Sequence, residues 1–79
     1  MKARIKIMLK KGVLDPQGEA IKHALNNFGF ESVTGVWQGK VIELDIEGSD
    51  KCQVRSQIES MCNKMLANTV IENFEIELL

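Results

Sequence analysis

Residues 2–10, KARIKIMLK, alternate strictly between apolar and polar side chains. Ala3, Ile5, Ile7 and Leu9 fall on one side of an extended chain, and the other side carries mostly basic residues. An alternation with a period of two predicts a β-strand with one buried and one exposed face. This strand decides the fold, because the other elements must cover its apolar face.

Two amphipathic helices are predicted. In the first, Asp15 suits the N-cap, Pro16 the first position and Gly29 the stop, and its apolar stripe consists of Ala20, Ile21, Ala24, Leu25 and Phe28. The second opens at residues 48–50, and its helical spacing is the clearest in the chain. Its apolar residues are Val54, Ile58, Met61, Cys62, Met65 and Leu66, and Asn68-Thr69 ends the pattern.

Residues 33–47 read as two short strands joined by a tight turn at Gly39-Lys40, after Trp37-Gln38. Gly35 interrupts the first of them, and a last strand alternates through Phe74, Ile76 and Leu78. The resulting order β-α-β-β-α-β predicts an α+β fold of the ferredoxin-like type, a two-layer sandwich. Two helices would cover one face of a four-stranded antiparallel sheet, and residues 1–79 would form a single domain.

In this topology the first strand lies between the third and the fourth. On the open face of the sheet, Arg4 and Lys6 would then meet acids on both sides. These acids are Glu43, Asp45, Glu75 and Glu77. No aromatic side chain falls on this face for stacking bases, and its acids would repel phosphates, so nucleic-acid binding is not expected.

Composition narrows the function further. The chain has 79 residues, a formal net charge of −1 and 44% hydrophobic residues, which indicates one small globular domain without a general attraction to anionic surfaces. No apolar run is long enough to span a bilayer, so no membrane association is expected. A domain this small often gains stability by associating with another chain.

Few side chains are suited to catalysis. The one histidine, His23, forms at best an exposed helical pair with Glu19, and no nucleophile is placed beside it. Cys52 and Cys62 are separated by ten positions of one helix, or about 15 Å, which is too far for a shared disulfide or metal ion. Cys62 is expected in the core and Cys52 as a free surface thiol; we expect no metal site and no catalytic residue.

Two features are not explained by core packing. Gly18 lies in the first turn of a predicted helix, where glycine costs about 0.5–1 kcal/mol relative to alanine; either a close backbone approach or a contact surface would justify it. Trp37 lies beside the predicted hairpin turn, where it either folds back onto the core or serves an oligomer interface.

The segments GVLDPQGEAIKHAL, VIELDIEG and ESMCNKMLANTVIENFEIEL together resemble the PurS family over essentially the whole chain. The resemblance implies a small, non-catalytic subunit of phosphoribosylformylglycinamidine synthase in purine biosynthesis. Its partners would be a glutaminase subunit and a large synthetase subunit, which uses ATP and magnesium; no cofactor is expected in this chain. The resemblance also implies a cytoplasmic protein that forms homodimers, and tetramers when isolated.

Under this resemblance the small subunit would bridge its two partners so that ammonia passes between them. The candidate contact residues are the motif positions least explained by the core, namely Asp15, Pro16, Gln17, Gly18, Gly39, Lys40 and Asn68. The alternative is a regulatory module similar to ACT domains that binds an amino acid, because such modules share the predicted topology and the tendency to dimerise.

Overall fold

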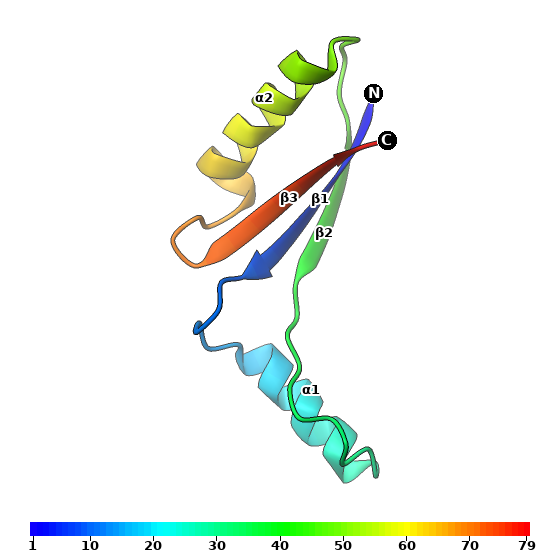
Figure 1. The fold of residues 1–79 in the computed structure, drawn as a ribbon, viewed down its shortest axis with the longest axis vertical. Coiled ribbons are helices and arrows are strands. Elements are labelled where there is room, and N and C mark those ends of the chain that lie inside the picture. The colour runs from blue at the N-terminus through cyan, green and yellow to red at the C-terminus, as the bar shows by residue number, and fades with distance from the viewer.

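The computed structural model describes all residues 1–79, which form an α+β fold around a three-stranded antiparallel sheet (Figure 1). The elements follow in the order β1 (Lys2–Leu9), α1 (Pro16–Asn27), β2 (Lys40–Asp45), α2 (Lys51–Met61), a short π-helix η1 (Cys62–Leu66) and β3 (Glu72–Leu78). The sheet order is β2-β1-β3, so the predicted central position of the first strand is confirmed. No helix is both long and apolar enough to cross a membrane.

The core lies between one face of the sheet and α2. Ala3 and Ile5 of β1 are fully buried, as strict alternation predicts, and they contact the buried Val54 and Ile58 of α2. Cys62, at the start of η1, is also fully buried in this cluster. The helical spacing therefore identified Val54, Ile58 and Cys62 as core residues. The prediction is wrong for Met61 and Met65 of the same stripe, which are 37% and 80% exposed.

The opposite face of the sheet carries the predicted charges, with one change in pairing. Arg4 lies opposite Glu43 on β2 and Glu77 on β3, and Lys6 lies opposite Glu75. The expectation that Asp45 meets Arg4 or Lys6 is wrong, because the register places Asp45 opposite Lys2 and Val41 opposite Lys6. The Arg4 guanidinium reaches its two glutamates at 3.7 and 3.9 Å.

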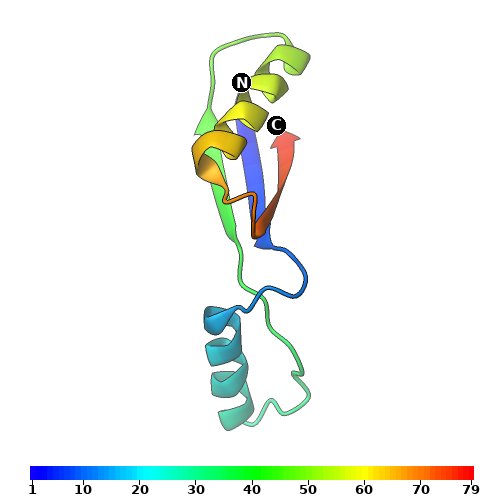
Figure 2. The same ribbon diagram turned by 90° about the vertical axis from the view of Figure 1, so that its left-hand side faces the viewer.

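The first helix does not cover the sheet. Figures 1 and 2 show α1 projecting beyond the ends of the strands, with the segment that follows it running back alongside it to β2. Residues 15–38, here called the arm, give the chain an extent of 49 Å along its longest axis. The radius of gyration is 16.1 Å, against about 12 Å for a compact chain of this length.

The predicted hairpin is not formed within the chain, so the sheet has three strands instead of four. Residues 33–39 belong to no strand, and β2 begins directly after them at Lys40. The chain passes Gly39 without reversing, because Gln38 is held by the arm and Gly39 lies against β1. A side chain at Gly39 would meet the backbone oxygen of Ile7 at 2.6 Å.

Candidate partner interface

Asp15 joins the two halves of the arm. It is the N-cap of α1, and its Oδ1 accepts a hydrogen bond from the backbone N–H of Gly18 at 2.9 Å. Its other oxygen, Oδ2, accepts from the backbone N–H of Gln38 at 2.8 Å, across 23 positions of sequence. The carboxylate thus does more than cap a helix: it fixes where the returning chain passes the start of α1.

These hydrogen bonds also define the charge state of Asp15. The N–H of Gln38 contributes most and that of Gly18 next, and together they hold the pKa of the Asp15 carboxyl below its usual value despite opposition from burial. Asp15 is therefore a carboxylate throughout the neutral range.

Gly18 has a structural explanation. A side chain there would collide with the backbone oxygen of Val36 and would lie 2.8 Å from Oδ2 of Asp15. The residue is buried, whereas its neighbours Gln17 and Glu19 are exposed. Of the two explanations that the sequence left open, a close backbone approach is therefore present, and a direct partner contact at Gly18 stays a prediction.

Five of the candidate contact residues meet at one place. They line a hollow of about 400 Å³ where the arm joins the sheet, here called the neck hollow: Asp15, Pro16, Gln17, Gly39 and Lys40. The remaining lining residues, which were not among the candidate contact residues, are Ile7, Leu9, Leu14, Gln38 and Glu72. Of these, Leu14 is the clearest omission, since its side chain is 75% exposed in the conspicuous LDPQG motif.

Asn68 lies apart from the neck hollow and shapes a turn. Its backbone N–H donates to Oε1 of Glu72 at 2.7 Å, and its Oδ1 accepts from the N–H of Val70 at 3.3 Å. Its carbonyl oxygen accepts from the backbone of Ile71 and Glu72. Asn68 therefore positions Glu72, which does line the neck hollow, and its own contact with a partner stays a prediction.

Trp37 lies outside the core. Its side chain is 71% exposed, and its indole ring covers Gly35, where a side chain would meet the ring at 2.7 Å. It borders a second hollow together with Met8 and Leu9. The explanation that Trp37 folds back onto the core is wrong, and its part in an interface stays a prediction.

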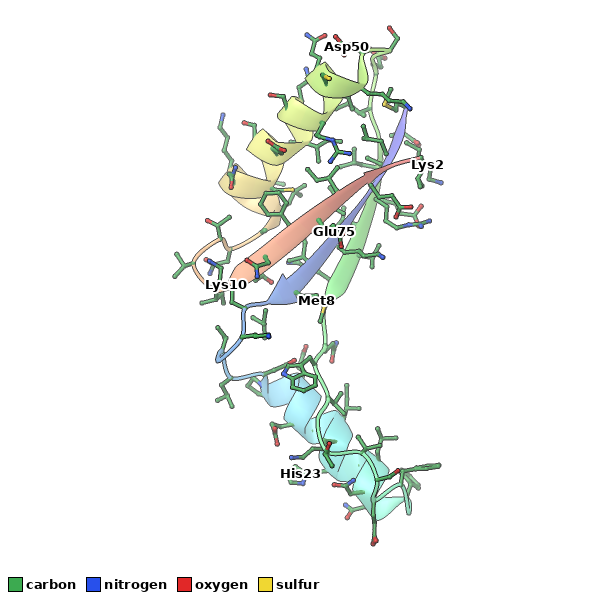
Figure 3. The ribbon with its side chains drawn as sticks, viewed as in Figure 1. Lys2, Met8, Lys10, His23, Asp50 and Glu75 are labelled. Carbon is green, nitrogen blue, oxygen red and sulfur yellow. The ribbon has the colours of Figure 1, made fainter.

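Nothing in this surface resembles a catalytic centre. No group of three or more histidine, cysteine, aspartate or glutamate side chains is placed to hold a metal ion. His23 lies 3.9 Å from Glu19 on the exposed side of α1, with 73% of its side chain accessible (Figure 3). The fold and this surface thus define a small α+β module whose sequence motifs lie on the exposed arm and around the neck hollow.

Comparison with known proteins identifies the family. The family model described as phosphoribosylformylglycinamidine (FGAM) synthase, PurS, matches residues 2–79. The PurS subunit of this synthase from Methanocaldococcus jannaschii is 46% identical over 96% of this chain and 92% of its own length. The Bacillus subtilis subunit is 45% identical over 96% and 89%, respectively. The chain belongs to the PurS family.

Solved structures agree with this assignment. A crystal structure of B. subtilis PurS matches with a TM-score of 0.87 and 45% identity, covering 96% of this chain and 94% of that one. A chain in the structure of PurLQS from Thermotoga maritima matches with a TM-score of 0.88 and 29% identity, covering 99% and 95%. These comparisons do not favour the amino-acid-binding module considered from the sequence.

Proposed function

We propose that this chain is the non-catalytic small subunit of phosphoribosylformylglycinamidine synthase and bridges a glutaminase and a synthetase subunit. The observation that carries this proposal is its similarity, over nearly its full length, to PurS chains, including one from a PurLQS structure. The arrangement of its own residues is consistent with it, since five of the candidate contact residues line one hollow where the arm joins the sheet.

In this role the chemistry belongs to the partners. The glutaminase releases ammonia from glutamine, and the synthetase uses ATP and magnesium to activate the amide of formylglycinamide ribonucleotide. This chain holds the two subunits in register, so that ammonia passes between them in the cytoplasm without escaping. It needs no cofactor of its own.

The neck hollow is the proposed contact surface for one of these partners. It combines apolar lining at Leu9 and Leu14 with hydrogen-bonding groups at Gln17 and the charged Lys40. Specific protein interfaces typically have an apolar centre, which the partner buries, and a polar rim around it. Gly18 and Asn68 support this surface through Asp15 and Glu72, respectively.

A homodimer is the second part of the proposal, and the exposed area of the chain supports it. The accessible surface is 5871 Å², about 1,000 Å² more than a folded monomer of 8.9 kDa exposes. A standard interface covers about 800 Å² on each partner. Large apolar side chains of the arm contribute to the excess, with Phe28 81% and Phe30 57% exposed.

Reconstitution tests the bridging role. Glutamine-dependent synthesis of formylglycinamidine ribonucleotide by the two partner subunits should require this chain, whereas synthesis from added ammonium should proceed with the synthetase alone. Equal glutamine-dependent rates with and without the chain would refute the proposal.

A charge reversal tests the surface. Lys40→Glu changes the sign of the charge at the neck hollow, and Lys51→Glu makes the same change at the start of α2. Figure 3 shows Asp50, next to Lys51, at the far end of the sheet from Met8 and Lys10. Weaker assembly with Lys40→Glu than with Lys51→Glu is expected, and equal effects would argue against the neck hollow as a contact.

A further inference from the structure

We propose that this chain binds a nucleoside phosphate in the hollow beside Trp37. The hollow has a volume of about 390 Å³, within the range of about 300–1,000 Å³ that is typical of small-molecule sites. It is here called the tryptophan hollow, and its lining residues are Met8, Leu9, Lys10, Lys11, Gly12 and Trp37. Figure 3 shows Met8 and Lys10 at the end of the sheet from which the arm projects. Such a site goes beyond the bridging role proposed above and does not depend on it.

One part of the lining is apolar and aromatic. Trp37 is the only tryptophan of the chain, and 71% of its side chain is exposed. Met8, which is 43% exposed, and Leu9 extend this surface. An exposed indole ring is a stacking surface for a nucleobase, and the polarisable thioether of methionine makes favourable contacts with aromatic rings. This part of the hollow therefore suits a planar aromatic group.

The other part of the lining is cationic. Lys10 and Lys11 follow β1, and neither forms an ion pair. No acid lines the hollow. Glu72, which lies opposite Leu9 in the sheet, instead accepts at Oε1 from the backbone N–H of Asn68 at 2.7 Å. Two ammonium groups without a carboxylate partner attract an anion, and lysine is a common phosphate ligand.

The turn after β1 supplies further donors to the same hollow. The N–H of Val13 donates to the carbonyl of Lys10 at 3.2 Å, and Gly12 has a φ of 85°, so residues 10–13 form a type II β-turn. The N–H groups of Lys11 and Gly12 donate to no acceptor in the chain. A side chain at Gly12 would meet no atom within 4 Å, so the space in front of this turn is open. Free backbone N–H groups at a turn are suited to binding an anion.

Together these groups favour a ligand with two joined parts. Inorganic phosphate would leave the surface of Trp37 and Met8 uncovered, and a neutral aromatic compound would leave Lys10 and Lys11 without a partner. A nucleoside phosphate places a base on the first surface and its phosphates on the second. A longer nucleic-acid strand does not fit, because the neighbouring open face of the sheet carries glutamates that repel further phosphates, such as Glu75.

The single tryptophan makes the hollow observable in solution. The chain has no tyrosine, so its intrinsic fluorescence comes from Trp37. The probe is ATP without divalent cations, and adenosine and tripolyphosphate represent its two parts. ATP should quench the emission saturably and bind on the order of tenfold more tightly than either part. No saturable quenching at millimolar ATP, or equally tight binding of tripolyphosphate, would overturn the proposal.

Charge variants test the cationic part of the lining. Lys10→Gln/Lys11→Gln removes two positive charges from the hollow, and Lys51→Gln/Lys64→Gln removes two from exposed lysines that also form no ion pair. The first double variant should weaken ATP binding on the order of tenfold, whereas the second should bind like the wild type. Trp37 is present in both, so the same measurement applies. Equal losses in the two variants would show attraction to overall charge alone and would refute this site.

Backbone amide signals in NMR spectra of the wild type give a test that needs no variant. The N–H groups of Lys11 and Gly12 should gain a phosphate acceptor, so their proton signals should move downfield as ATP saturates the quenching. Gly48 is the control, because it also has a positive φ and an N–H without an acceptor but lies in the loop before α2. Unchanged signals at Lys11 and Gly12, or an equal shift at Gly48, would contradict binding at this turn.

Discussion

Replacing Gly18 by alanine should destabilise this protein, although the same change stabilises most helices. Gly18 lies in the first turn of α1, where its backbone N–H is held by Asp15 at 2.9 Å. An alanine methyl group would collide with the backbone oxygen of Val36 and lie 2.8 Å from Oδ2 of Asp15. The Val36 oxygen belongs to the backbone, and Oδ2 of Asp15 is held by the N–H of Gln38, so the returning segment must move away from α1.

The two opposing contributions set the expected magnitude. Alanine in place of glycine within a helix contributes about 0.8–1.0 kcal/mol of stability. Displacing the returning segment breaks the charge-assisted bond between Asp15 and Gln38, and hydrogen bonds to charged groups contribute about 1.5–3 kcal/mol. The net result is a loss of about 0.5–2 kcal/mol.

Equilibrium unfolding in urea at one fixed protein concentration measures this difference, with the concentration held constant because association shifts apparent stability. With a slope of about 1–2 kcal/mol per molar urea, the midpoint should fall by about 0.25–2 M. Ala20→Gly, in the same helix and exposed, is the matched control and should lose only the propensity difference. A Gly18→Ala variant more stable than the wild type would refute the reasoning, because it would mean that α1 and Val36 do not approach closely.

Three further outcomes follow from the structure. The pKa of Asp15 is lowered in the folded protein, so the ionised carboxylate stabilises the fold fully above the ordinary carboxyl pKa of about 3.9, and this contribution disappears as the pH falls further. Asp15→Asn should therefore have a lower free energy of unfolding than the wild type at pH 7, and the difference between the two should shrink below about pH 4. A thiol reagent at neutral pH should modify one cysteine per chain, because Cys52 is exposed, whereas burial raises the pKa of the fully buried Cys62; rapid modification of both thiols before unfolding would contradict this core. Arg4→Gln removes the two ion pairs that Arg4 forms on the open face and should cost only about 0.2–1 kcal/mol in urea unfolding. A loss unaffected by added salt would argue against an electrostatic origin.

The elements whose buried face follows from the spacing of their own apolar residues could be predicted from the sequence. β1, α2 and β3 show side-chain patterns that match the faces they bury, from Ala3 and Ile5 to Ile58. Formation of α1 was also predictable, since Asp15 and Pro16 specify its start. The position of α1 was not predictable, because an apolar stripe indicates that a helix packs against another surface but not whether that surface belongs to the same chain.

The hairpin failed for a related reason. A Gln-Gly sequence between two extended segments allows a tight turn, and it equally allows a straight passage. The choice depends on contacts distant in sequence, namely the bond from Gln38 to Asp15 and the packing of Gly39 against Ile7. The same distant contacts explain why the motif residues gather in the neck hollow, while Asn68, selected on the same grounds, lies elsewhere.

The central place of β1 in the sheet has a consequence for biosynthesis. This strand is made before β2 and β3, yet one of its two neighbours is β3, and Ala3 pairs with Leu78, 75 positions later in the sequence. At about 5–20 residues per second, the nascent β1 must wait several seconds with its apolar face exposed. The sheet is therefore completed only after β3 has been made, and its long-range pairing favours slow folding. Chaperone binding to the segment Lys2–Leu9 during that interval would protect the strand on which the rest of the fold depends.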